Sequence, residues 1–351
     1  MSRRRVLLLA AAALATVLLF LDLRGRLGPA GPVAASGLEA CTVLEAPAGP
    51  EDLQIDHGSG LAVIAAHDRR AGNAQGGLHW LDLARPDAPI RPLPHDGPPD
   101  FRPHGLSLFR RGGVLHALVV NHPADGHTIE AFRLETGAAP RAVHVATFSG
   151  DALVSPNDVV AAGPERFYVS NDHGLRAAWL RPLEDLLGLG LGTVVLHDGR
   201  RFVPVVPGRR MANGVTLARG GDLLVAETLG RRIVRFPREP RSGRVDLEAP
   251  TIVEVPTGPD NLDLAPDGSL WFAAHPSLRA FLGHARDPQA RAPWEVWRLA
   301  EGRAERVLAG DGSRLSAASV AAARGRTLLV GAVFDGALLR CTLPPALAPG
   351  P

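Results

Sequence analysis

The sequence predicts an all-β protein, a six-bladed β-propeller, and three observations lead to this fold. The chain contains 39 Gly and 31 Pro in 351 residues, which favours many turns and therefore many short strands. No linker divides residues 41–343 into two parts of different composition. A phrase made of a small loop, a strand rich in Val, Leu or Phe, a turn and a further strand recurs six times, about once every 50 residues.

The recurring phrase defines the expected blades. Strand-built repeats of this length are typical of propellers with about four strands in each blade. A β-sandwich is the alternative, but regular recurrence along the chain disfavours it. We therefore expect a propeller domain at 41–343 and a C-terminal tail at 344–351. The six phrases are GLAVIAAHD (60–68), VLHALVVNH (114–122), RFYVSNDHG (166–174), GDLLVAETLGRRIVRF (221–236), GSLWFAAHP (268–276) and RTLLVGAVFDGALLRC (326–341).

The chain opens with a predicted export segment. Three Arg precede an apolar run from Val6 to Leu21 that only Thr16 interrupts, and this order is typical of an export signal. The run is shorter than the roughly 20 residues that comfortably span a bilayer, and no clean cleavage site follows it directly. Residues 1–26 are thus predicted to be a signal peptide or a signal anchor, with a linker at 27–40. We expect an exported protein in the periplasm, anchored to a membrane or outside the cell.

One helix is expected among the strands. Residues 175–190, LRAAWLRPLEDLLGLG, have an apolar face and directly follow the third phrase. Their position beside a polar NDH loop favours a short lid helix, and a plain packing helix explains the pattern equally well.

Two cysteines lie near the two ends of the predicted domain. A disulfide between Cys41 and Cys341 would fasten the first and last strands into one blade and close the ring, as an oxidising compartment permits. Two unpaired buried cysteines would give the same sequence.

Composition disfavours one class of partner. The 38 basic residues are all Arg, they are scattered, and the net charge is only +2. Because no basic stripe forms, we expect no nucleic-acid partner.

Asparagine marks the candidate site. The chain has six Asn, and five of them lie in short polar clusters beside predicted strands, NHP, PND, SND, ANG and PDN. Turn formation alone explains them poorly, since Asp and Gly serve that purpose elsewhere in the chain. Amide and carboxylate oxygens together suit Ca²⁺, whereas the chain has no Cys cluster or HExxH motif for zinc. Adjacent pairs point in opposite directions in extended backbone, so they could serve two ions along one axis.

Eight segments together resemble a known family. They are GPEDLQI, PHGLSLF, LVVNHPADGHTIEAF, PNDVVAAGPERFYVSNDHG, ANGV, PDNLDL, AAHP and VFDGALLRC, in this order. They are similar to segments of the serum paraoxonase/arylesterase family, calcium-dependent lactonases with a six-bladed propeller. The resemblance runs from about Cys41 to Cys341, and it implies a central calcium channel with two Ca²⁺ ions.

The resemblance also implies roles for individual residues. For the catalytic calcium it implies Glu51, Asn157, Asn213, Asp260 and Asn261, and for a structural calcium Asp52, Asp158 and the Leu106 carbonyl. For a histidine dyad it implies His104 and His122, and for further active-site positions Asp172, His173 and His275. It implies a disulfide between Cys41 and Cys341, and membrane association through residues 6–21. The chain departs from the animal members at Ala274, where those have a free cysteine, and it has no Asn-x-Ser/Thr glycosylation site.

The expected activity is hydrolysis of small-molecule lactones and aryl esters. Calcium would polarise the substrate carbonyl, His104 would take a proton from water, and His122 would orient His104 or relay the proton. Hydrolysis of sugar lactones or phosphotriesters on the same fold is one alternative. A non-catalytic binding propeller, stiffened by calcium, is the other.

Overall fold

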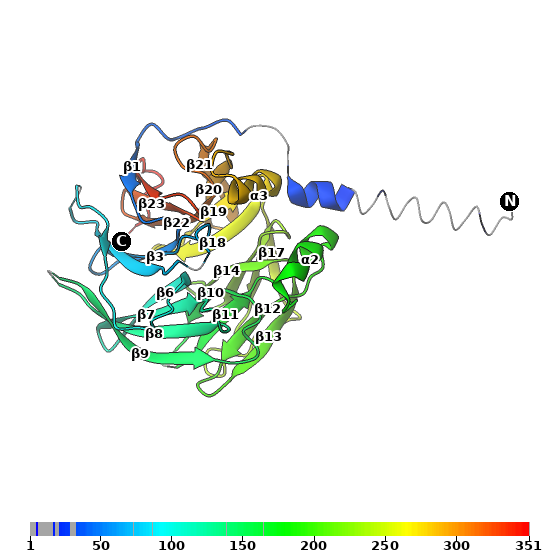
Figure 1. The fold of residues 1–351 in the computed structure, drawn as a ribbon, viewed down its shortest axis with the longest axis horizontal. Helices are drawn as coiled ribbons and strands as arrows, with labels where there is room; N and C mark the ends of the chain where they lie inside the picture. The colour runs from blue at the N-terminus through cyan, green and yellow to red at the C-terminus, as the bar shows by residue number, and fades with distance from the viewer. Residues whose placement is uncertain are drawn as a thin grey trace.

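Six four-stranded antiparallel sheets, arranged around one axis, make up the body of the protein (Figure 1). The computed structural model describes Arg5, Val17, residues 21–28 and residues 33–350 except 73, 86, 138 and 164. The predicted six-bladed β-propeller is confirmed over these residues. Most of the apolar run at 6–21, on which the export prediction depends, lies outside the described residues.

Each sheet runs from the central axis to the rim. The innermost strands are β2 (Pro50–Asp56), β6 (Pro103–Arg111), β10 (Pro156–Ala161), β14 (Ala212–Leu217), β18 (Gly258–Leu264) and β22 (Ala318–Arg324). The second strands are β3 (Leu61–Ala66), β7 (Val114–Asn121), β11 (Phe167–Asn171), β15 (Leu223–Glu227), β19 (Leu270–His275) and β23 (Thr327–Ala332). All six second strands fall within the recurring phrases.

The outer strands complete the blades. The third strands are β4 (Gly77–Asp82), β8 (Thr128–Glu135), β12 (Gly192–His197), β16 (Arg232–Phe236), β20 (Trp294–Ala300) and β24 (Ala337–Thr342). The outermost are β5 (Arg91–Pro92), β9 (Arg141–Ser149), β13 (Phe202–Arg209), β17 (Thr251–Glu254), β21 (Arg303–Gly310) and, in the last blade, β1 (Cys41–Glu45).

The apolar core is divided among the spaces between sheets. Six clusters of buried apolar residues lie in the described chain, one between each pair of neighbouring sheets. Strand β3 shows why the second strands are almost continuously apolar. Its successive side chains point to opposite faces, so Val63 packs in one cluster and Ile64 in the next. A strand buried on both faces has no place for the polar alternation of a half-exposed strand.

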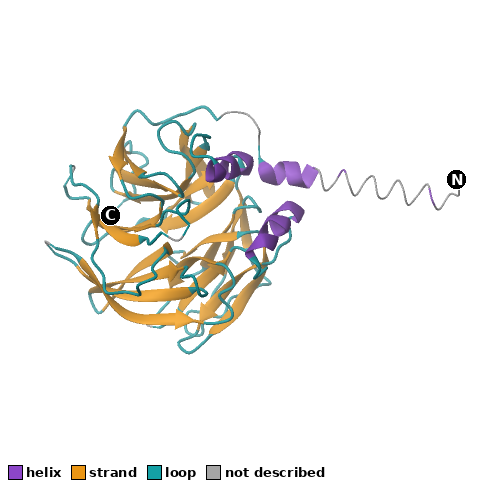
Figure 2. Cartoon of the chain, viewed as in Figure 1, coloured by secondary structure: helices purple, strands orange, loops and turns teal. Residues whose placement is uncertain are grey.

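The helices gather on one side of the propeller (Figure 2). Residues 21–27 are helical, η1 spans Ala178–Leu180, α2 spans Arg181–Leu187 and α3 spans Leu278–Arg286. Within the predicted helix at 175–190, the structure thus forms two short helices. Among the described residues, no helix combines the length and the hydrophobicity needed to cross a membrane.

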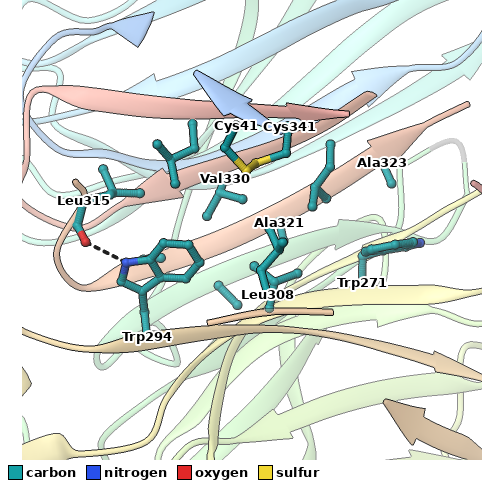
Figure 3. Close-up of a cluster of buried hydrophobic side chains, with 14 of the residues drawn as sticks. Cys41, Trp271, Trp294, Leu308, Leu315, Ala321, Ala323, Val330 and Cys341 are labelled. Carbon is teal, nitrogen blue, oxygen red and sulfur yellow. Dashed lines mark hydrogen bonds between the residues drawn. A yellow bond between two sulfur atoms is a disulfide. The ribbon is translucent and has the colours of Figure 1, made fainter. Parts of the chain in front are cut away.

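A disulfide closes the ring. Strand β1 pairs with β24 in the last blade, and their register places Cys41 opposite Cys341, which are joined through sulfur. Figure 3 shows the bond above an apolar cluster that contains Trp294, whose indole Nε1 donates a hydrogen bond to the Leu315 carbonyl oxygen at 2.6 Å. Of the two possibilities that the sequence left open, the cysteines form a bond.

Reduction of this bond should destabilise the propeller. The bond spans 300 residues, so its loss frees a long loop in the unfolded chain and opens the seam of the ring. We expect urea unfolding with and without dithiothreitol to differ by about 2–5 kcal/mol in free energy of unfolding. A Cys41→Ser/Cys341→Ser double variant should be equally destabilised and should not respond to the reductant. Equal stability of the oxidised and reduced proteins would contradict this account.

Candidate active site in the central channel

The innermost strands share one irregularity, which builds the candidate site. Each of the six shifts its register against the second strand near its first residues. Such bulges leave residues unpaired and redirect their side chains. The residues inside the six shifts are Glu51, His104, Gly105, Asn157, Asp158, Asn213, Gly214, Asp260, Asn261 and Ser319. All five predicted ligands of the catalytic calcium are therefore at the same level of the channel, together with His104.

Glycines allow neighbouring inner strands to approach closely at this level. A Cβ atom added to Gly105 would lie 2.5 Å from the Cα of Asp158, and one added to Gly214 would lie 2.5 Å from the carbonyl oxygen of Asp260. Both distances are too short for any side chain. The two glycines thus bring the polar residues of adjacent blades together.

Among the described residues, four buried oxygens at this level have no hydrogen-bond partner. They are Glu51 Oε2, Asn157 Oδ1, Asn213 Oδ1 and Asn261 Oδ1. Leaving a buried acceptor unsatisfied costs about 1–3 kcal/mol, so a cluster of four indicates a ligand. Carboxylate and amide oxygens suit a hard cation such as Ca²⁺, and the predicted residues therefore fit one. No group of three or more His, Cys, Asp or Glu able to hold a metal occurs in the described part of the chain, so this set depends on its asparagines.

Hydrogen bonds fix the direction of these side chains. Asn261 Nδ2 donates to Glu51 Oε1 at 3.0 Å and to the Glu51 carbonyl at 3.2 Å, which turns its own Oδ1 away. Ser319 Oγ donates to the same carbonyl at 2.6 Å. His275 Nε2 lies 2.7 Å from Asp260 Oδ2, which places this predicted active-site histidine behind a predicted ligand.

Two carboxyl groups at this level have shifted pKa values. Burial acts to raise the pKa of Glu51, but His104 Nε2 at 3.3 Å from Oε1 and Arg69 at 3.5 Å from Oε2 outweigh it and lower the pKa to about 2. Burial also raises the pKa of Asp260. A divalent cation would offset the repulsion between these groups.

The predicted ligands of the second calcium, Asp52 and Asp158, have a different environment. Asp52 accepts hydrogen bonds from the backbone N–H groups of Leu53 at 2.8 Å and Leu106 at 2.6 Å. Asp158 accepts from Val159 and Val215, both at 2.7 Å. Each carboxylate therefore links its own inner strand to the next one, and burial and neighbouring carboxylates raise both pKa values well above their usual range. Neither carboxylate has an unpartnered oxygen, so a second ion at these residues and Leu106 stays a prediction.

The two predicted catalytic histidines touch. His104 Nδ1 lies 2.9 Å from His122 Nε2, and His122 Nδ1 lies 2.9 Å from His127 Nδ1. Burial lowers the pKa of His122 well below 6.5, and the neighbouring His104 and His127 lower it further. His122 is therefore a neutral imidazole at neutral pH, able to accept a hydrogen bond on one nitrogen and donate one from the other.

Asp172 and His173 connect the site to α2. Asp172 Oδ1 accepts from Ser155 Oγ at 2.5 Å and lies 2.8 Å from His173 Nδ1. His173 Nε2 lies 3.0 Å from Asp185 Oδ1 on α2. Burial acts to lower the pKa of His173, but the two carboxylates outweigh it and raise the pKa to about 10. Asp172 also lies 3.5 Å, through Oδ2, from Nδ2 of Asn157.

Sequence reasoning missed four residues of the site, Arg69, His127, Ser155 and Ser319. His127 follows His122 by five residues in NHPADGH, a spacing that could have identified it. The others belong to no motif, because Arg and Ser are common and their partners are distant in sequence.

Comparisons with known proteins found a matching family, related sequences and similar folds. The model of the family described as Arylesterase matches residues 39–343. Human serum paraoxonase/arylesterase 1 is 30% identical over 306 residues, covering 83% of this chain and 85% of its own. Human serum paraoxonase/arylesterase 2 is 30% identical over 336 residues, covering 91% and 93%. A crystal structure of regucalcin, a calcium-binding protein from Agrobacterium tumefaciens, has a similar fold, with a TM-score of 0.52 and 16% identity over 89% of this chain and 94% of its own.

The His173 ion pairs should make stability depend on pH. The folded-state pKa of about 10 exceeds the unfolded value of about 6.5, so their stabilisation is complete below pH 6.5 and is lost as the pH rises to 10. The difference in free energy of unfolding between wild type and His173→Gln should shrink over this range in urea titrations. His116→Gln is the control, because burial lowers the pKa of His116 in the wild type. This variant should show no such decline above pH 6.5. A difference for His173→Gln that is constant from pH 6 to 10 would rule out the ion pairs.

Proposed function

This chain belongs to the arylesterase family and is therefore an ester-hydrolysing enzyme, and we propose that it is a calcium-dependent hydrolase of lactones and aryl esters. The observation that carries this proposal is the cluster of four unpartnered buried oxygens beside the paired imidazoles of His104 and His122. A site that only stiffened the channel would not need a histidine at the level of these oxygens.

The residues that would hold the calcium are Glu51, Asn157, Asn213, Asp260 and Asn261. The chemistry that a bound calcium supplies is that of a Lewis acid, which favours negative charge on the substrate carbonyl oxygen. Arg69 adds a positive charge next to Glu51, and His275 holds Asp260. The protein thus orients the oxygens before substrate arrives, and electrostatic stabilisation requires this preorganisation.

The three histidines can move a proton outward from the channel. If each imidazole donates to the next, His104 Nδ1–H donates to His122 Nε2, and His122 Nδ1–H donates to His127 Nδ1. This order leaves His104 Nε2 as the atom that accepts a proton from water, and the imidazolium so formed pairs with Glu51 Oε1, which lies 3.3 Å from Nε2. His122, kept neutral by burial, holds the required tautomer of His104. His127 extends the predicted dyad toward the loop between β7 and β8.

The substrate would be a small molecule, because the reacting groups lie inside the channel. The family relation supports an ester or lactone bond as the target. The disulfide supports the exported location that the N-terminal segment predicts, since disulfides persist in oxidising compartments.

Removal of calcium should abolish hydrolysis. We expect phenyl acetate and acyl-homoserine lactone turnover to fall to background after treatment with EDTA, and to return when Ca²⁺ is added in excess, because the buried oxygens then regain their cation. The measurement is the initial rate on both substrates with a panel of sugar lactones and phosphotriesters beside them. Undiminished turnover in EDTA would sink the calcium mechanism, and bound calcium without turnover on any substrate would favour a binding propeller.

Two substitutions should separate proton transfer from metal binding. His104→Gln removes the proposed base and should lower kcat by about 10²–10⁴-fold while leaving the calcium Kd near wild type. Asn213→Ala removes an unpartnered oxygen and should raise the calcium Kd, as measured by isothermal titration. His116→Gln, on the second strand of its blade and away from the bulges, is the matched control and should change neither quantity. Full activity of His104→Gln would exclude it as the base.

A further inference from the structure

The residues just before the propeller contact α2 through a buried arginine. Arg26 is 4% exposed and belongs to the helical segment at 21–27. Its Nη1 donates to the carbonyl oxygen of Asp185, its Nη2 donates to that of Leu186 at 3.1 Å, and its Nε donates to the Asp22 carboxylate at 2.9 Å. The guanidinium is thus held between its own helix and the C-terminal end of α2. Figure 1 shows the segment, in blue, on the same side of the molecule as α2.

Helix α2 depends on such contacts for its position. It has seven residues, too few to be stable alone, and its only buried residue is Glu184. Free carbonyl groups at a helix C-terminus carry partial negative charge, so a guanidinium that donates to them stabilises the helix. Gly188 ends α2 with a φ of 63°, and a Cβ atom there would lie 2.6 Å from the guanidinium carbon of Arg26. Any side chain at position 188 would therefore collide with the guanidinium group of Arg26.

From α2, a continuous chain of contacts leads into the channel. Asp185 contacts His173, His173 contacts Asp172, and Asp172 Oδ2 faces Nδ2 of Asn157 at 3.5 Å. Because the amide nitrogen of Asn157 faces Asp172, its Oδ1 is on the other side of the amide, where no described residue hydrogen-bonds to it. The position of α2 thus affects the direction in which the amide oxygen of Asn157, a candidate calcium ligand, points.

We propose that Arg26 is a positioning residue of the enzyme. It holds α2 in place, and the chain of contacts described above then sets the direction of the Asn157 amide. The segment that precedes the propeller is therefore part of the working structure, in addition to any role in export. The statement about Asn157 rests on the function proposed above, which assigns its oxygen to calcium.

The test compares Arg26→Gln with Arg24→Gln in the full-length chain. Arg24 lies in the same helical segment with an exposed side chain, so it is a matched control. Arg26→Gln should speed amide hydrogen exchange in α2 and raise the calcium Kd about tenfold, whereas Arg24→Gln should change neither. Arg26→Lys keeps the charge and should recover part of the loss. Thermal unfolding of each variant confirms that the propeller is folded.

A double-mutant cycle tests whether Arg26 acts through α2. Asp185→Ala removes the carboxylate that contacts His173 but keeps the backbone carbonyl that Arg26 binds. If both residues act through the same series of contacts from α2 to Asn157, the double variant should raise the calcium Kd by clearly less than the product of the two single effects. Additive effects, or faster exchange in α2 with an unchanged calcium Kd, would overturn the proposal. If the wild type bound no calcium, the proposed function would fail and the inference about Asn157 with it, while unchanged exchange in Arg26→Gln would separately refute the contact with α2.

Discussion

Buried oxygen atoms that lack a hydrogen-bond partner in the described structure are the constraint on which the rest of the site depends. Six strands surround the channel, and a regular propeller would pair each of them without interruption. Here each inner strand breaks its register at the same level. Four residues at these breaks carry an oxygen without a hydrogen-bond partner among the described residues, namely Glu51, Asn157, Asn213 and Asn261. Each unsatisfied buried acceptor costs about 1–3 kcal/mol, so a ligand that satisfied these oxygens would stabilise the arrangement. The local irregularity of the sheets and the cation that we propose therefore involve the same residues.

Adjacent residues divide two tasks between them. Glu51 and Asp52 are neighbours, as are Asn157 and Asp158, yet in the described structure only the first of each pair has an oxygen without a hydrogen-bond partner. Asp52 and Asp158 accept backbone N–H groups from the next inner strands and so join the blades. A short step along the chain thus separates the residues that suit binding from those that hold the ring together, with the apolar clusters and the disulfide behind them.

The second layer of the site lies outside the inner strands. His122 and His127 extend from His104, His275 supports Asp260, and further contacts run from Asn157 to α2 and Arg26. Each branch leads from a bulge to a loop or helix on one face of the propeller. Under the proposals made above, changes in these outer elements would alter the chemistry in the channel without touching a substrate.

The sequence by itself determined the repeat and most of the innermost polar residues, and it left open whether the two cysteines at its ends pair. Strands such as β3 and β19, buried on both faces, read as short apolar runs, and only six asparagines make each one conspicuous. The family resemblance assigned roles to residues that spacing alone could not rank. Local patterns of this kind can be recognised in the sequence because each depends only on the residues of one strand.

Only the tertiary structure decided how the site is assembled. The register shifts, the partner of Arg69, the hydrogen bond of Ser319 and the contact of Arg26 with α2 join segments far apart in the chain. Arginine and serine are too common to mark a site, and the direction of an amide depends on donors that other blades supply. These features arise when the ring closes, because only then do the distant partners meet.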